Sequence, residues 1–167
     1  MNDDTSARLR LPHLQPGQAQ KELYHNEALA LIDIGLQASV KAVGLESPPS
    51  DPKPGECWIV GPAPTGVWSG QAKALAGWTA GGWRFVAPVA GMTVWSEQDR
   101  LSAQYESDAW HVGELRTSVV MIAELPVVGA RQPAIGTPQG GLTVDTQARA
   151  ALSAILVALR SHGLIAP

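Results

Sequence analysis

The polar segment PGQAQKELYHNEALALID, at positions 16–33, comes nearest to the residue types and spacing of a catalytic or metal site. Glu22 and His25 are three residues apart, a spacing that the helices of carboxylate-bridged metal proteins use. Such a site also needs a second Glu-x-x-His pair, and the other strong helix offers only Asp145 near its start. We therefore predict no metal ligands and no cofactor. The segment suits a docking or oligomer contact, whose residues are Gln18, Gln20, Lys21, Glu22, His25, Asn26 and Glu27.

The other motifs that could carry out catalysis are incomplete. No serine stands in a Gly-x-Ser-x-Gly turn, and the single cysteine, Cys57, has no neighbouring histidine and no disulfide partner. Glycoside hydrolysis needs only two carboxylates close together, and sequence spacing cannot exclude such a pair. The acids available for it are Glu97, Asp99, Glu106, Asp108 and Glu114. Because these acids cluster at expected turns, where water solvates them, a polysaccharide depolymerase is the weakest hypothesis and we predict no catalytic residues.

Tryptophan gives a stronger signal than any of these motifs. Six of the nine aromatic residues are Trp, and all six lie between positions 58 and 110. Trp stacks well on the apolar face of a sugar ring, so these residues could form a glycan-binding platform. The candidates for this platform are Trp78, Trp83, Trp95, Tyr105 and Trp110. The alternative is that Trp fills the core of a small β module whose strands are short, and for any single Trp we favour the core.

Composition and periodicity predict an α+β fold in which helical segments flank a small antiparallel β module, built as a barrel or a sandwich. Asp145 is the expected N-cap of the amphipathic C-terminal helix, and Gly163 is its expected left-handed cap. The predicted segments are an extended arm (1–16), an N-terminal helix (17–46), a Trp-rich β module (47–128), a Pro/Gly-rich connector (129–144) and the C-terminal helix (145–167).

The charge content predicts association. Charged residues make up 16% of the chain, against roughly 25% in an average soluble domain, while apolar residues make up an ordinary 45%. We expect part of the surface to be buried against copies of the chain or another protein. A net charge of −3 and a pI near 5.7, without a basic cluster, argue against nucleic acid as a partner. No apolar run is long enough to insert into a membrane, and the polar N-terminus predicts synthesis in the cytoplasm.

Two stretches carry a family resemblance. LPHLQPGQAQKELYHNEALALID, followed by GECWIVGPAPTGVWSGQAKALAGWTAGGWRFVAPVAGMTVW, resembles a domain of unknown function that is common in alphaproteobacterial prophages and gene transfer agents. The closing DTQARAALSAILVALRSHGLI is similar to a short helical tail often found in the same proteins. Family members are surface appendages of phage-like particles, either tail fibres or head spikes that help particles adhere to capsule polysaccharide.

The resemblance implies a role as well as a fold. The 167 residues resemble the base component of a head spike more than a fibre, because neither a repetitive shaft nor a large receptor-binding domain is evident. The implied assembly is a homo-oligomeric ring, pentameric at a capsid vertex, that contacts a capsid vertex protein and holds a fibre protein on the particle surface. A carbohydrate-binding module of a tail fibre is the alternative.

Overall fold

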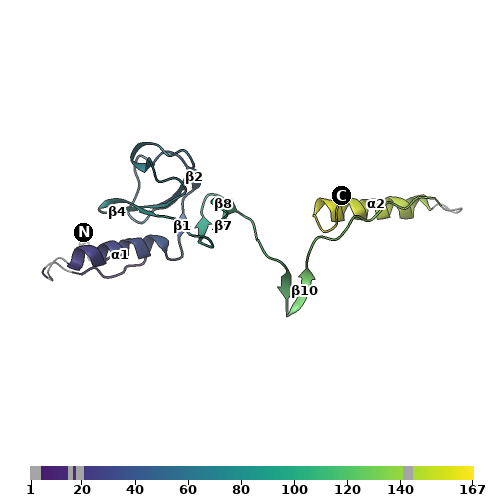
Figure 1. Ribbon diagram of the computed structural model, residues 1–167, viewed down its shortest axis with the longest axis horizontal. Coiled ribbons are helices and arrows are strands. Elements are labelled where there is room, and N and C mark those ends of the chain that lie inside the picture. Colours follow the sequence, from purple (N-terminus) through teal and green to yellow (C-terminus); the bar gives the residue numbers. More distant parts are fainter. Residues whose placement is uncertain (1–4, 15–16, 18–20, 141–144) are drawn as a thin grey trace. The chain divides into compact units, whose positions relative to one another are not determined.

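The computed structural model describes residues 5–14, 17, 21–140 and 145–167. The chain divides into an N-terminal unit, Met1–Glu114, and a C-terminal unit, Leu115–Pro167 (Figure 1). The fold is α+β, as predicted. In the N-terminal unit the elements are α1 (Lys21–Gly35), β1 (Ser39–Val40), β2 (Val43–Leu45), β3 (Cys57–Val60), the short 3-10 helix η1 (Gly66–Trp68), β4 (Leu75–Thr79), β5 (Gly82–Val86), β6 (Thr93–Ser96), β7 (Leu101–Glu106) and β8 (Ala109–Val112). The C-terminal unit contains β9 (Val120–Ile122), β10 (Leu125–Val128) and α2 (Thr146–Ser161).

Two open four-stranded sheets form the N-terminal unit. Sheet A has the order β2-β3-β4-β5 and sheet B the order β1-β6-β7-β8. Most neighbours are antiparallel hairpins, but β2 pairs with β3 and β1 with β6 in parallel. The strands are therefore not closed into the barrel that was one of the two predicted alternatives.

The N-terminal helix is shorter than its predicted span of 17–46. Helix α1 ends at Gly35, and Gln37 takes a left-handed φ of 47° that stops helical propagation. The residues that follow form β1 and β2, one on the edge of each sheet. Val40 and Val43 are β-branched, which suits these strands better than the last turns of a helix.

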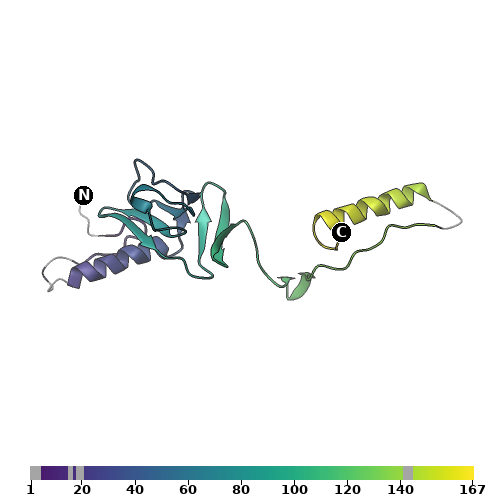
Figure 2. The ribbon, with the colours of Figure 1, turned by 45° about the horizontal axis from the view of Figure 1, so that its top comes forward.

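The main core lies where α1 and the two sheets meet. Helix α1 packs on β4 and β5 of sheet A, and Figure 2 shows it alongside the strands. The contact depends on Gly77, since a Cβ at that position would lie 2.5 Å from Cγ1 of Ile34. The buried members of this core are Ile34, Ala38, Val40, Cys57, Ile59, Leu75, Val94 and Ala103.

The C-terminal unit consists of a β-hairpin, a connector and α2. The side chain of Asp145 accepts a 2.8 Å hydrogen bond from Ala148 N, so the predicted N-cap is confirmed. Gly163 has a φ of 71°, which confirms the predicted left-handed cap. Leu164 N donates to Leu159 O and Gly163 N to Arg160 O, the pattern of a Schellman motif. Hairpin β9–β10 lies within the predicted β module of 47–128 but belongs to the C-terminal unit.

Within the described residues, neither helix combines the length and the hydrophobicity that a membrane crossing requires.

Candidate functional site

The polar residues at the start of α1 divide between internal contacts and the surface. Asn26 Oδ1 accepts a hydrogen bond from Leu14 N at 2.9 Å, and its Nδ2 donates to Leu14 O at 3.1 Å. Glu27 forms an ion pair with Arg84 of β5, with Oε1 2.7 Å from Nε. These two predicted docking residues therefore tether the chain's own arm and sheet to α1.

The other described docking residues lie at the start of α1 and are less engaged by the rest of the chain. Lys21 is exposed, and the nearby His25 Nδ1 lies 2.8 Å from the Lys21 carbonyl oxygen. Glu22 is half-buried, and its buried Oε2 has no hydrogen-bond partner. Gln18 and Gln20 lie outside the described residues. Of the residues predicted for docking, the described ones that are left to meet a partner are Lys21, Glu22 and His25.

A carboxylate that sequence reasoning missed organises the arm. Asp33, only 4% exposed, accepts hydrogen bonds from Ser6 Oγ at 2.8 Å, from Arg8 N at 2.9 Å and from Leu9 N. The Arg8 guanidinium donates to backbone carbonyls at the end of α1, where a cation also interacts favourably with the helix dipole. The arm is thereby folded back as a turn against the helix. The available signal was an acid inside the apolar half of the helix, in ALALIDIGL.

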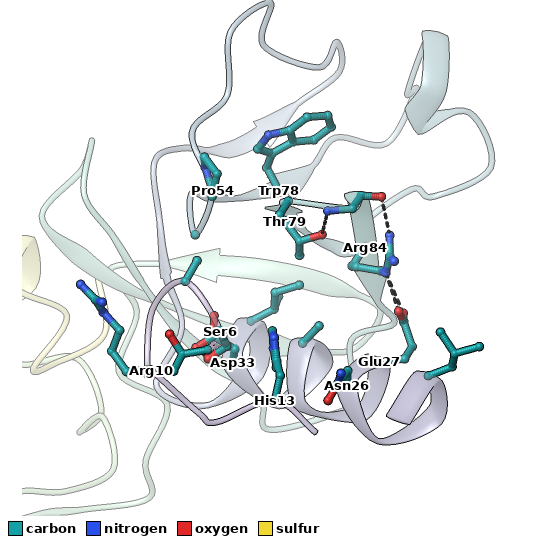
Figure 3. Close-up of a pocket in the computed structure, with 18 residues that line it drawn as sticks. Ser6, Arg10, His13, Asn26, Glu27, Asp33, Pro54, Trp78, Thr79 and Arg84 are labelled. Carbon is teal, nitrogen blue, oxygen red and sulfur yellow. Dashed lines mark hydrogen bonds and ion pairs between the residues drawn. The ribbon is translucent and has the colours of Figure 1, made fainter. Parts of the chain in front are cut away.

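An open pocket of about 620 Å³ lies between this arm, α1 and the β4–β5 turn (Figure 3). Several of its polar walls are bonded to one another: Arg84 Nη1 donates to Gly81 O at 3.2 Å, and Thr79 Oγ1 donates to Gly82 O at 2.8 Å. Figure 3 shows the Trp78 ring directed away from α1. The Arg84 side chain is already engaged by Glu27 as well, so these groups hold the walls together. The hydroxyl of Ser6, also in the lining, donates to Asp33 and so holds the arm to α1.

The outer face of α1 is apolar and open. Tyr24 is 83% exposed on this face, whereas Leu23, 65% exposed, lines the pocket. Large side chains of the following turns, Leu31, Ile32 and Leu36, are also exposed. The sequence pattern predicted a helix that is apolar on several sides, and the structure buries one side against sheet A and leaves another uncovered. An uncovered apolar helix face that is exposed to solvent indicates a contact surface.

Four of the six Trp residues cluster on the face of sheet A that points away from α1. Trp83 is at the centre, with ring centroids 5.0 Å from Trp68, 5.0 Å from Trp78 and 5.5 Å from Trp58, all in edge-to-face geometry. Such packing contributes beyond area burial. Trp58 and Trp68 are buried, whereas Trp78, Trp83 and the adjoining Phe85 are half-buried. This cluster is therefore partly core and partly surface.

The five predicted platform residues do not share one surface. Trp78 and Trp83 are cross-strand partners on sheet A. Tyr105 and Trp110 pair on sheet B with centroids 5.3 Å apart, and Trp110 Nε1 donates to Lys73 O at 2.8 Å. Trp95 is opposite Ser102, three residues from Tyr105 on β7, so strand alternation places it on the other face of sheet B. The aromatic platform that we consider further therefore consists of Trp78 and Trp83 on sheet A, together with the neighbouring Phe85.

The acids considered for glycoside hydrolysis are held by neighbouring side chains. Hydrogen bonding from the Lys41 ammonium, 2.7 Å away, is the main cause that lowers the pKa of Glu97, with help from Ser39. Asp108 has its pKa lowered chiefly by the Lys73 ammonium and then by the Tyr105 hydroxyl. Asp99 Oδ2 accepts a hydrogen bond from Ser96 Oγ at 2.6 Å, Glu114 Oε2 lies 3.5 Å from His111 Nδ1, and Glu106 is half-buried. The lowered pKa values keep Glu97 and Asp108 ionised, whereas a general acid needs a raised one.

Cys57 is buried in the main core, and burial is the largest cause that raises the pKa of its thiol to about 11. A thiol in this state is a poor nucleophile at neutral pH. Among the residues that the structure describes, no group of His, Cys, Asp and Glu has the arrangement of a metal site.

Comparison with known proteins gives a family without a known activity. No curated protein matches the chain. A family model described as "Protein of unknown function (DUF2793)" matches residues 25–111, from the second turn of α1 to β8. The match thus includes most of α1 and every strand of sheets A and B. Because it covers just over half of the 167 residues, the chain belongs to the family of proteins of unknown function DUF2793.

Proposed function

We propose that this chain is a structural component of a phage-like particle, the base of a gene transfer agent head spike. In this role it is made in the cytoplasm, oligomerises at the capsid vertex and anchors a fibre protein that adheres to the capsule polysaccharide of recipient cells. Family membership supports the identification of the domain and not its role, because the family has no assigned activity. The particle context comes from the resemblance of the segments quoted above.

The observation that carries the proposal is the uncovered apolar face of α1, which carries Tyr24, Leu31 and Ile32. The opposite side of α1 packs on sheet A, and Ile34 is almost fully buried there. Exposing large apolar side chains to water is costly, and a protein partner removes that cost. Lys21 and His25, exposed on the first turns of the same helix, provide polar groups that would fix the register of such a contact.

A binding experiment on particles tests this role. Purified chain is mixed with gene transfer agent particles that lack head spikes, and bound protein is measured by co-sedimentation. We expect the wild type to bind and Tyr24→Glu to bind at least tenfold more weakly, because a charge would be buried without a partner. Val89→Glu is the matched control, since Val89 is also exposed but is not on α1. A wild-type chain that fails to sediment with the particles would refute the proposed role.

The half-buried aromatic cluster favours a second candidate, the carbohydrate-binding module of a tail fibre. Trp78, Trp83 and Phe85 present aromatic surface beside one another on sheet A. Their rings suit stacking on a sugar. Trp78→Ala, Trp83→Ala and the fully buried Trp68→Ala should be compared for glycan binding and thermal stability together. Loss of binding by Trp78→Ala without loss of stability favours the module, whereas stability losses in all three variants favour a purely structural cluster.

A further inference from the structure

The C-terminal unit has almost no core of its own. Among its described residues, 115–140 and 145–167, only Leu156 at 7% and Ile165 at 5% exposure are buried. The main core and the Trp cluster both belong to the N-terminal unit. A helix and a hairpin cannot be stabilised by two buried side chains, because the entropy of ordering 53 residues needs far more apolar burial to offset it.

Hairpin β9–β10 exposes apolar residues on both faces. Neighbouring residues on a strand point to opposite faces, and every residue from Met121 to Val128 is exposed. The large apolar side chains of this stretch are Met121, Ile122, Leu125, Val127 and Val128. Its two strands pair only with each other. An isolated two-stranded hairpin is marginally stable in water, so this one requires further contacts.

The open surface of α2 carries few charges. The two charged residues of the helix, Arg149 and Arg160, both donate hydrogen bonds to the connector, at the carbonyl oxygens of Gly140 and Ile135. Exposed apolar side chains, Leu152, Ile155 and Val157, remain on the helix. A helix that faces water normally carries charged residues on that face.

The sequence of this unit offers no other means of stabilisation. It contains no cysteine for a disulfide, and one histidine and two acids for a metal. Small units without such crosslinks are commonly stabilised by oligomerisation. An apolar surface with few charges does not select a charged partner, but it is complementary to the same surface on another copy.

We propose that the C-terminal unit is the self-association element of this protein, in which hairpins β9–β10 and helices α2 from separate copies of the chain pack together. The inference rests on the proposed function only for the expectation of self-association. It assigns that association to residues 115–167, which lie outside the family match and outside α1. The N-terminal unit, with its own core, is then free to meet the particle.

Molar mass in solution tests this assignment on the full-length chain. We expect the wild type to have at least twice the 17.6 kDa chain mass by light scattering at micromolar concentration. Val127→Glu on the hairpin, 51% exposed, and Val157→Glu on α2, 62% exposed, should shift it towards 17.6 kDa. Val89→Glu, 65% exposed in the N-terminal unit, is the matched control and should leave the assembly intact. Fluorescence of the six Trp residues, all in the N-terminal unit, shows whether that unit stays folded in each variant.

The outcomes separate this inference from the proposed function. A wild-type chain that stays at 17.6 kDa at all concentrations overturns the assignment. An assembly that survives Val127→Glu and Val157→Glu but is dissociated by Tyr24→Glu also overturns it, because the contact would then be on α1. An assembly that depends on Val127 and Val157 but does not bind particles supports the assignment and refutes the particle role.

Discussion

Asp33 gives the sharpest test of how the N-terminal unit is held together. Its carboxylate is buried and accepts hydrogen bonds from Ser6 Oγ and from the backbone N–H groups of Arg8 and Leu9. Substitution to Asn keeps the shape of the side chain but replaces one acceptor oxygen with an NH2 group. Because Oδ1 accepts two of the bonds and Oδ2 the third, an Asn can retain at best the pair at Oδ1.

The expected loss follows from these bonds. Asp33→Asn removes one charge-assisted hydrogen bond and turns a donor towards Arg8 N, which should cost about 2 kcal/mol of unfolding free energy. Asp33→Ala removes all three bonds and leaves two backbone N–H groups without their acceptor, for a loss of about 4 kcal/mol. The loss is limited at that level because the arm can detach and let water solvate Ser6, Arg8 and Leu9.

Urea unfolding followed by Trp fluorescence measures this quantity. All six Trp residues are in the N-terminal unit, so the signal reports on that unit alone. Asp51→Asn is the matched control, because Asp51 is an exposed acid whose ion pair with Lys53 lies at the surface and contributes little to stability. If Asp33→Asn lies within about 0.5 kcal/mol of the control, the arm does not depend on Asp33 and the account given above is wrong.

Three further predictions concern the same unit. Gly77→Ala should destabilise it by about 1–3 kcal/mol in urea unfolding, because the new Cβ would overlap Ile34, whereas Gly35→Ala, with open space around its Cβ, should not destabilise it. The hydrogen bond from Lys41 lowers the pKa of Glu97 below its ordinary 4.5. The stability that this pair contributes is therefore present above pH 4.5 and is lost as the pH falls through the pKa of the folded state. Glu97→Gln should make the unfolding free energy depend less on pH in this acid range. Cys57, with a pKa raised by burial to about 11, should react with a thiol reagent at pH 8 about a hundredfold more slowly in the folded protein than in urea.

Features of the fold that depend on local sequence could be predicted. Both caps of α2 follow from residues within one turn of its ends, Asp145 and Gly163, and both are as expected. The α+β class also follows from local patterns, since short apolar runs bounded by turn residues predict strands wherever these strands pair.

Features that depend on distant partners could not be predicted. β1 forms because Ser39 and Val40 pair with Trp95 and Ser96, over 50 positions away in the sequence. Helix-forming residues in the same region led to a predicted helix that extends beyond its observed end at Gly35. Similarly, nothing near Asp33 in the sequence indicates that the arm returns to it. The predicted docking residues and Trp platform were chosen by type, but tertiary pairing decides which side chains share a surface.

The division into two units shows where along the chain charged residues are scarce. The N-terminal unit carries 21 charged residues in 114 positions, and the C-terminal unit carries six in 53. Two of those six, Arg149 and Arg160, are engaged by backbone carbonyls and contribute little to an open polar face. The shortage of charged residues is therefore greatest in the unit with the smallest core. Such a unit, alone in water, is stabilised neither by apolar burial nor by a well-solvated charged surface. Contact with another copy would supply the missing burial and requires no added charge, which is why we propose that the assembly expected from composition forms at hairpin β9–β10 and α2.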